Sequence, residues 1–469
     1  MKRLFISLSL ILVAFAGFAQ DVTGDWYGSL TVPGATLPVV MHIKKTAAGY
    51  SATMDSPAQQ AIGIPMDETT FSDNKLVIAF KAGSLKYSGT FLPDSNKING
   101  NLQQGSGNFP LILSREKQVY TPEDKTRPQD PKDHPYLQEE VRFPNPKGGN
   151  TLSGTLTLPS DGKTKKIVIL ITGSGPQNRN EEIKQYNHRP FLVLSDWLTR
   201  NGIGVLRYDD RGVAKSTGNF NTATTADFAD DAEAAVNFIK SRPDLKSLSI
   251  GLLGHSEGGM IAPVIASRNK SVKFIVLLAG PGIPITELMV RQNEDQLRLM
   301  AAPDSVIMRA NETNTLIYKV VTNNPSLSAA VLKLKLDSTL HKKYATDPEN
   351  AISKVSDDKQ IANISEAVVQ PWFRYFLGFR PADYLLKVQC PVLALNGMLD
   401  KQVSATPNLS AIKAALTKGG NKRFEIAPMP GLNHMFQTAV TGGVGEYAQI
   451  TETINPVVLI KVTSWINGL

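Results

Sequence analysis

Cysteine is almost absent from this chain of 469 residues, in which Cys390 is the single thiol. An intramolecular disulfide is therefore excluded, and the fold must be held by an apolar core. Cys390 lies directly before the apolar run PVLALNG, which is typical of a buried strand. We therefore interpret it as a small core residue rather than a reactive thiol.

Histidine clusters and basic stripes are also lacking. The six histidines form no H-x-x-x-H pair or other spacing typical of a zinc site, so we expect no metal and no cofactor. The formal net charge is +8, but the lysines and arginines are spread thinly, without a basic stripe that contains interleaved aromatics. Nucleic acid is therefore not an expected partner.

Long apolar runs are lacking except at the start of the chain. There, two cations precede an apolar run from Leu4 to about Phe18, and Gly17 and Ala19 form a cleavage-like site. This pattern predicts a secretory signal peptide at residues 1–19 and export to the periplasm or the outside of the cell. An uncleaved membrane anchor is the alternative, but the polar segment QDVTGDW follows at once. We expect no membrane span in the mature chain.

The segment at 20–116 is typical of short strands separated by turn residues. Even spacing without a helical period predicts a small antiparallel barrel or sandwich. Its single histidine, His42, fits a strand residue facing polar surroundings better than a catalyst. Residues 117–135 are rich in proline and charge, which predicts a stiff linker. The expected strands are WYGSLTV, PVVMHIKK, GYSATM, KLVIAF, LKYSGTF, KINGNLQ and PLILSRE.

The pattern changes in residues 136–469, where expected strands alternate with expected helices. Continuous apolar runs such as KIVILIT and FIVLLAG are typical of strands that are covered on both faces. Segment 224–243 begins with a Thr-x-x-Asp capping box and ends before a proline, which predicts a helix. The alternation predicts a doubly wound, mostly parallel α/β sheet.

This alternation stops at about 281–380, a segment rich in helix-forming residues. An insertion of this size between two core strands predicts a helical lid over the C-terminal edge of the sheet. Its aromatic residues either wall an acyl pocket or pack within the lid, and we favour packing. They are Trp372, Phe373, Tyr375 and Phe376.

The stretch LLGHSEGG is a G-x-S-x-G motif between an expected strand and an expected helix. In such a sharp turn Gly254 and Gly258 are needed because a Cβ would clash with the backbone nearby. The turn would hold the Ser256 hydroxyl above the carboxyl edge of the sheet, at a helix N-terminus. A glycine-rich turn with an incidental serine is the alternative.

A serine nucleophile needs a base and an orienting acid, in the order Ser, acid, His for this architecture. His434 lies in a glycine-containing loop after the last expected strand, whereas His341 lies in the insertion. Asp400 follows the strand PVLALNG and is the expected acid. Glu425 is the second choice, although it lies within a strand.

The tetrahedral oxyanion of acyl transfer needs two backbone N–H donors. We expect one from Glu257, directly after the nucleophile, and the other from Ser174 in the loop GSGPQNRNE, with Gly175 as its alternative. The Glu257 side chain fits a helix start better than an acid catalyst. Asp209 and Arg211 are expected to brace the site through ion pairs.

These motifs resemble the bacterial carboxylesterase branch of the α/β-hydrolase superfamily. The segments that carry the resemblance are, in order, ITGSGPQNRNE, RYDDRGVAKSTG, LLGHSEGG, PVLALNGMLDKQV and GLNHMF. The resemblance covers about residues 136–469. It implies Ser256 as nucleophile, His434 as base and Asp400 as orienting acid.

The same resemblance implies an oxyanion loop at 173–177. The chain departs from many relatives in having Thr172 where they carry histidine, which leaves the second oxyanion donor open. The N-terminal β domain is similar to modules that precede other exported hydrolases.

We therefore expect an exported serine hydrolase that cleaves a small-molecule or glycan-linked carboxylic ester. One alternative is a serine aminopeptidase, which needs acids that bind a free N-terminus. Glu287, Glu294 and Asp295 lie at a suitable end of the insertion, but nothing in the sequence pairs them. The other alternative is a glycan- or envelope-binding protein that acts through its β domain.

Overall fold

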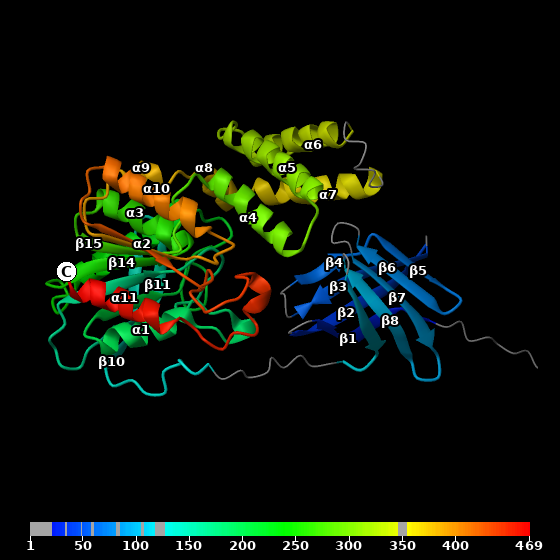
Figure 1. The fold of residues 1–469 in the computed structure, drawn as a ribbon, viewed down its shortest axis with the longest axis horizontal. Helices are drawn as coiled ribbons and strands as arrows, with labels where there is room; N and C mark the ends of the chain where they lie inside the picture. Colours follow the sequence, from blue (N-terminus) through cyan, green and yellow to red (C-terminus); the bar gives the residue numbers. More distant parts are fainter. Residues whose placement is uncertain are drawn as a thin grey trace, which may run out of the picture. The chain divides into compact units, whose positions relative to one another are not determined.

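The computed structural model describes residues 21–32, 35–47, 49–57, 61–80, 85–104, 107–117, 127–345 and 354–469. The chain divides into two compact units, Met1–Thr121 and Pro122–Leu469 (Figure 1). The expected signal peptide at 1–19 lies outside the described residues, and so does the part of the expected linker at 118–126.

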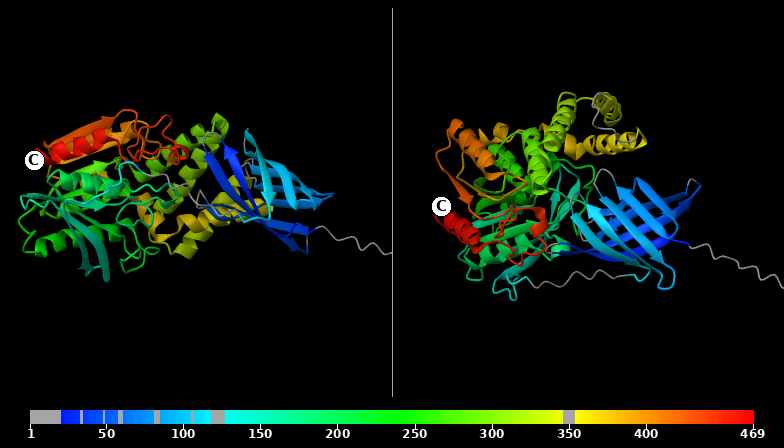
Figure 2. Two further views of the ribbon diagram at one scale, coloured as in Figure 1. Left: turned by 90° about the horizontal axis from the view of Figure 1, so that it is seen from below. Right: turned by 45° about the vertical axis from the view of Figure 1, so that its right-hand side comes forward.

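The described part of the first unit is one antiparallel sheet of nine strands, in the order β4-β3-β2-β1-β9-β8-β7-β6-β5. The sheet curls until β5, at one edge, contacts β3 near the other edge (Figure 2). The predicted all-β fold is confirmed, in the form of a partly open barrel. The strands are β1 Gly24–Val32, β2 Ala35–Thr46, β3 Gly49–Ser56, β4 Ala61–Pro65, β5 Glu68–Ser72, β6 Lys75–Phe80, β7 Leu85–Leu92, β8 Lys97–Gln104 and β9 Gly107–Ser114.

Large side chains fill the interior of this unit. In β7, Leu85, Tyr87 and Phe91 are buried, whereas the residues between them are exposed or half-buried. Trp26 is fully buried, and its ring meets the Phe91 ring edge-on at 5.8 Å between centroids. Because successive side chains of a strand point to opposite faces of the sheet, the residues on one face form the core.

Within the described residues of the second unit, eight strands form a sheet in the order β10-β11-β13-β12-β14-β15-β16-β17. The strands from β13 to β17 in this order pair in parallel, and only the β10–β11 and β11–β13 pairs are antiparallel. The predicted mostly parallel sheet is confirmed. The strands are β10 Leu137–Asn145, β11 Asn150–Leu158, β12 Lys166–Ile171, β13 Gly204–Tyr208, β14 Ser249–His255, β15 Val272–Leu278, β16 Val392–Gly397 and β17 Phe424–Met429.

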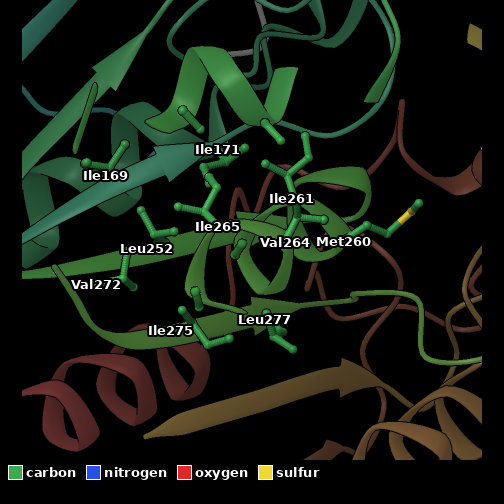
Figure 3. Packing of buried hydrophobic residues seen from close by; sticks show 14 of the residues in the cluster. Ile169, Ile171, Leu252, Met260, Ile261, Val264, Ile265, Val272, Ile275 and Leu277 are labelled. Atoms are coloured by element: carbon green, nitrogen blue, oxygen red, sulfur yellow. The ribbon is translucent and has the colours of Figure 1, made fainter. Parts of the chain in front are cut away.

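Helices cover both faces of this sheet. β12 sends Ile167, Ile169 and Ile171 into the core on one face, and Val168 and Leu170 into the core on the other. Figure 3 shows the first of these cores, where side chains of α3 meet those of the strands. The helices on that face are α2 Thr225–Ser241, α3 Glu257–Arg268 and α10 Ala405–Lys418, and those on the other are α1 Pro190–Arg200 and α11 Pro456–Asn467.

The predicted helical insertion lies between β15 and β16 (Figure 1). Its α5 and α6 share a hydrophobic cluster that includes Ile317, Leu332 and Leu336, so the insertion has a core of its own. Its helices are α4 Ile285–Leu299, α5 Asp304–Thr322, α6 Ala329–Ala345, α7 Lys354–Val368 and α8 Pro371–Gly378, and the short α9 Ala382–Leu385 follows.

The described end of the expected linker, residues 127–135, is bound to the second unit. The buried Arg127 donates through Nη1 to the Glu452 carbonyl oxygen at 3.1 Å. Gln129 donates through Nε2 to the Ile454 carbonyl oxygen at 2.7 Å. Side chains therefore tie this segment to the residues just before α11 in the second unit. In the parts of the chain that the structure describes, no helix is long and apolar enough to cross a membrane.

Candidate active site

Ser256 lies on a strained turn between β14 and α3. Its φ of 51° and ψ of −115° fall outside the regions that a residue with a side chain usually adopts. The turn is held by its backbone N–H, which donates to the Leu278 carbonyl oxygen at 2.8 Å. Ser256 is half-buried, whereas the residues on both sides of it are buried.

The two glycines of the motif are needed for the close approach of backbone segments. A Cβ added to Gly258 would lie 2.1 Å from the Ile171 carbonyl oxygen. A Cβ added to Gly254 would lie 2.0 Å from the Gly258 oxygen. Neither contact is possible between real atoms, so the turn that presents Ser256 excludes any larger residue at these positions.

The structure brings Asp400 and His434 together. Asp400 follows β16 and His434 follows β17, and the His434 Nδ1 lies 2.8 Å from the Asp400 Oδ2. The other carboxylate oxygen of Asp400 accepts from the N–H groups of Gln402 and Val403, each at 2.8 Å. The His434 side chain is 5% exposed and the Asp400 side chain is 0% exposed. The carboxylate is therefore fixed, and it orients the imidazole.

No hydrogen bond joins the Ser256 hydroxyl to His434 in the described structure. The two residues are connected through His255, whose ring lies 4.8 Å from the His434 ring. In free enzymes the contact between nucleophile and base is often long, and it tightens when substrate binds. The geometry thus brings His434 and Asp400 together, and it leaves the Ser256 hydroxyl on the turn that follows His255.

The loop after β12 lies against Ser256. A Cβ added to Gly173 would be 3.2 Å from the Ser256 Cβ. The Gly173 N–H donates to the Glu181 Oε1 at 2.7 Å, so it is not available to an oxyanion. The N–H groups of Ser174 and Glu257 make no hydrogen bond with the described residues. Their assignment as oxyanion donors stays a prediction.

The Glu257 side chain, in contrast to its backbone N–H, makes hydrogen bonds within the protein. Its Oε1 accepts from the Thr225 hydroxyl at 2.6 Å and from the Trp372 Nε1 at 3.0 Å. Burial raises the pKa of the Glu257 carboxyl, against the effect of both hydrogen bonds. Because Trp372 belongs to α8, this carboxyl connects the turn at Ser256 to the helical insertion. The Trp372 ring also stacks on Phe376, at 4.7 Å between centroids.

A small cavity lies behind the loop and is lined in part by Gly173, Gly175, Asp210 and Glu257. It has room for about 10 Å³, roughly the space of a single water molecule, so it is too small for a substrate.

Burial raises the pKa of Asp210 well above its ordinary value, although its carboxyl accepts from the Thr172 hydroxyl at 2.9 Å.

Ion pairs brace the loops around the site. The Arg179 Nη2 donates to the Asp209 Oδ2 at 2.7 Å, and the Arg211 Nε donates to the Asp231 Oδ2 at 2.6 Å. All four residues are buried. Asp209 and Arg211 therefore have the bracing ion pairs that the sequence predicts. Within the described residues, no observed hydrogen bond joins either of them to Ser256.

The second choices from the sequence lie elsewhere. Glu425 forms an ion pair with Lys461 of α11. His341, on α6, contacts Asp358 of α7 at 2.7 Å. Among the described residues no group of three or more His, Cys, Asp or Glu side chains could hold a metal ion.

Sequence reasoning did not assign a role to Glu181 and His255. The His255 Nδ1 lies 2.9 Å from the Glu181 Oε1, and its Nε2 lies 3.1 Å from the His434 carbonyl oxygen. Both residues lie within the motifs ITGSGPQNRNE and LLGHSEGG. Their position within these motifs is the sequence signal from which a role near Ser256 could have been predicted.

The comparison with protein families identifies the second unit. A sequence model of the family described as serine aminopeptidase, S33, matches residues 162–438, more than half of the chain. The chain belongs to this family. The S33 hydrolase match begins just before β12 and ends just after His434, so it includes every residue of the site described above.

Two curated relatives match part of this S33 hydrolase. Esterase EstD of Thermotoga maritima is 33% identical over 151 residues, which are 32% of this chain and 34% of EstD. The uncharacterized protein YfhR of Escherichia coli O157:H7 is 28% identical over 160 residues, 34% of this chain and 51% of YfhR. The chain thus spans about a third to a half of the length of these relatives.

Solved structures similar to this S33 hydrolase include the esterase Pf2001 of Pyrococcus furiosus, with a TM-score of 0.42 and 17% identity. That similarity covers 76% of this chain and 94% of Pf2001. The hypothetical protein PA2218 from Pseudomonas aeruginosa has a TM-score of 0.45 and 15% identity, and the similarity covers 75% and 99% of the two chains.

Proposed function

We propose that this hydrolase cleaves carboxylic esters, with Ser256 as nucleophile, His434 as base and Asp400 as orienting acid. The observation that carries the proposal is the strained turn at Ser256 beside a buried Asp400–His434 pair. A turn of this kind exposes a hydroxyl at a helix N-terminus, where negative charge is favoured. The similarity to a protein named esterase supports the choice of an ester as substrate.

In the proposed reaction, His434 takes the proton of Ser256 as the Oγ attacks the ester carbonyl carbon. Asp400 keeps the His434 Nδ1 protonated, so that its other nitrogen can accept. The N–H groups of Glu257 and Ser174 stabilise the oxyanion. The alcohol leaves with the proton from His434, and water then releases the acid from the acyl-enzyme.

A peptidase that uses the same three residues is the competing proposal, because the family is named for serine aminopeptidases. The acids that the sequence suggests for a free N-terminus have other partners. Glu287 is paired with Arg291, and Glu294 with Arg298, each within α4. Asp295 accepts from the Ser404 hydroxyl at 3.0 Å. This distribution favours the ester over the peptide.

We also propose that the chain is exported and that residues 1–19 are removed. The support is the sequence of that segment alone. Edman sequencing of the protein recovered from the periplasm of a Gram-negative host tests this proposal. A mature N-terminus at about Gln20 is expected, and an intact Met1 in the cytoplasm would contradict it.

The function is tested with p-nitrophenyl esters from acetate to decanoate and with an aminoacyl p-nitroanilide. We expect ester hydrolysis by the wild type and a loss of about 10⁴-fold or more in kcat for Ser256→Ala. Ser267→Ala is the matched control, since Ser267 lies on α3 and its hydroxyl only caps the Val264 carbonyl. Cleavage of the anilide alone would favour the peptidase, and full activity of Ser256→Ala would overturn the proposed mechanism.

A further inference from the structure

Glu181 is a buried carboxylate that the proposed reaction does not use. It lies in the loop after β12, has a φ of 51° and is 3% exposed. Its Oε1 accepts from the Gly173 N–H at 2.7 Å and lies 2.9 Å from the His255 Nδ1. A charged group this deeply buried is costly unless its partners compensate. In Glu181 both contacts are made by Oε1.

His255 faces an acceptor on each side of its ring. The Nδ1 faces the Glu181 carboxylate, and the Nε2 faces the His434 carbonyl oxygen, which can only accept. Both contacts are made only when the pair Glu181–His255 holds one proton more than a carboxylate and a neutral imidazole. The pair then carries no net charge, which suits a fully buried position.

The groups around His255 favour this extra proton. Burial alone lowers the pKa of His255, but the Glu181 carboxylate, the His434 carbonyl and the negative charge of Asp400 together raise it above its ordinary value. His188 also faces this region, and burial lowers its pKa to about 4, so it brings no competing positive charge at neutral pH.

The contacts of this pair reach three loops that are distant in sequence. Gly173 follows β12 and lies against the Ser256 Cβ. His255 ends β14 and directly precedes Ser256. The third contact is to the backbone of His434, in the loop after β17. Oxyanion loop, nucleophile and base are therefore connected through two side chains.

We propose that Glu181 and His255 are positioning residues, which hold the Gly173 loop and the His434 backbone in register with Ser256. This inference rests on the proposed function. The His434 ring is already fixed by Asp400 at its Nδ1. The Glu181–His255 pair fixes the backbone of His434 through the His255 Nε2. It also sets the direction of the amides that follow Gly173, because Glu181 accepts from the Gly173 N–H. Displacing reacting groups by about 1 Å costs roughly 100-fold in rate.

Glu181→Gln is the sharpest variant because it keeps the shape of the side chain. A glutamine oxygen at the Oε1 position would keep the hydrogen bond from the Gly173 N–H. The substitution would still remove the charge that supports a doubly protonated His255. A glutamine nitrogen at that position would lose Gly173. Either way, one of the three contacts breaks.

We expect Glu181→Gln to lower kcat by about 10- to 100-fold while KM changes less than about threefold. Binding of a boronic acid, which mimics the tetrahedral intermediate, should weaken by the same factor as kcat/KM. Glu182→Gln is the matched control, since Glu182 is half-buried in the same loop and, within the described residues, its carboxylate accepts only from the Asn178 Nδ2, at 2.8 Å. The control should match the wild type in kcat.

Two further measurements separate positioning from a general loss of stability. In ¹⁵N spectra of histidine-labelled wild-type enzyme, the signal that His255→Gln removes should come from an imidazole with both ring nitrogens protonated. This signal should be absent in Glu181→Gln. The double variant Glu181→Gln with His255→Gln should lose no more activity than the more damaging single variant, because both break one connection.

Wild-type kcat and boronate affinity in Glu181→Gln would overturn the inference, as would additive losses in the double variant. Failure of the proposed function has a different signature. In that case Ser256→Ala would keep its activity, whatever Glu181→Gln does.

Discussion

Each of the two units holds a histidine in contact with aspartate, and the two histidines differ in their surroundings. In the first unit, the His42 Nδ1 lies 2.7 Å from Asp25 and its Nε2 lies 2.9 Å from Asp55. In the second unit, the His434 Nδ1 lies 2.8 Å from Asp400. The distances are alike, so hydrogen bonding to a carboxylate does not distinguish the two.

Burial and the second ring nitrogen distinguish them. The His42 side chain is 29% exposed, and both of its nitrogens are taken by carboxylates. The His434 side chain is 5% exposed, and its Nε2 makes no hydrogen bond with the described residues. His434 also has a serine on a strained turn close by. A base for catalysis needs one nitrogen fixed and the other available, and of these two histidines His434 has this arrangement.

The largest effect is expected from the two aspartates themselves. Asp400→Asn keeps the shape of the acid but favours the wrong tautomer of His434, so kcat should fall by about 10⁴-fold. Asp55→Asn, at the other histidine, should leave kcat unchanged. Steady-state hydrolysis of the best p-nitrophenyl ester measures both. A fall of less than threefold for Asp400→Asn would show that His434 does not depend on this acid.

The strained turn of the second unit is the next target. Gly258→Ala places a Cβ within 2.1 Å of the Ile171 oxygen, so it should destabilise the fold by more than about 3 kcal/mol or abolish activity. Gly445→Ala is the control, because no atom lies within 4 Å of its added Cβ. Denaturant unfolding and ester hydrolysis are measured together. A stable and active Gly258→Ala enzyme would be inconsistent with this turn.

His42 should affect stability in a pH-dependent way. Burial lowers its pKa, but the hydrogen bonds to Asp55 and Asp25 outweigh burial, and the pKa is raised. A pKa that is higher in the folded state stabilises the fold below the unfolded value of about 6.5, and this is lost as the pH rises through the folded value. His42→Gln should therefore lower the melting temperature of the first unit more at pH 5.5 than at pH 9.

Calorimetry of the full chain at the two pH values measures this difference. His134→Gln, which changes an exposed histidine of the second unit, is the control. An equal loss at both pH values would mean that the charge of His42 does not contribute.

The smallest effect is expected at Glu425, the acid that the sequence offers as second choice. Its carboxylate is paired with Lys461 and is 41% exposed. Glu425→Gln should change kcat less than twofold and the free energy of unfolding by less than about 1 kcal/mol, because exposed ion pairs contribute little. Ester hydrolysis and urea unfolding check this, and a large loss of kcat would assign the acid's role to Glu425.

Local signals explain what could be predicted from the sequence. The capping box of α2 is present, with the Asp227 carboxylate accepting from the Thr224 N–H at 2.9 Å. Glycines at fixed offsets around Ser256 predicted the turn, because only glycine fits the contacts found there. Asp400 and His434 were singled out because each follows an apolar strand at the same sheet edge.

Weak local patterns explain the elements that were missed. β4 and β5 are five residues each, and β5 has no fully buried side chain. In β10 the first four residues are exposed, so alternation begins only at Val141. The contact of His255 with Glu181 spans 74 residues and that with His434 spans 179. No spacing in the sequence encodes such contacts, which arise only when parallel strands place their ends together.

The most direct test of the central claim is stoichiometric labelling with a fluorophosphonate, followed by peptide mass spectrometry. The account predicts one phosphonyl group per chain, on Ser256, with ester hydrolysis lost in proportion to labelling. His434→Ala should slow labelling strongly, and His42→Ala should not. Labelling at another serine, or ester hydrolysis that persists when Ser256 is fully modified, would contradict the account.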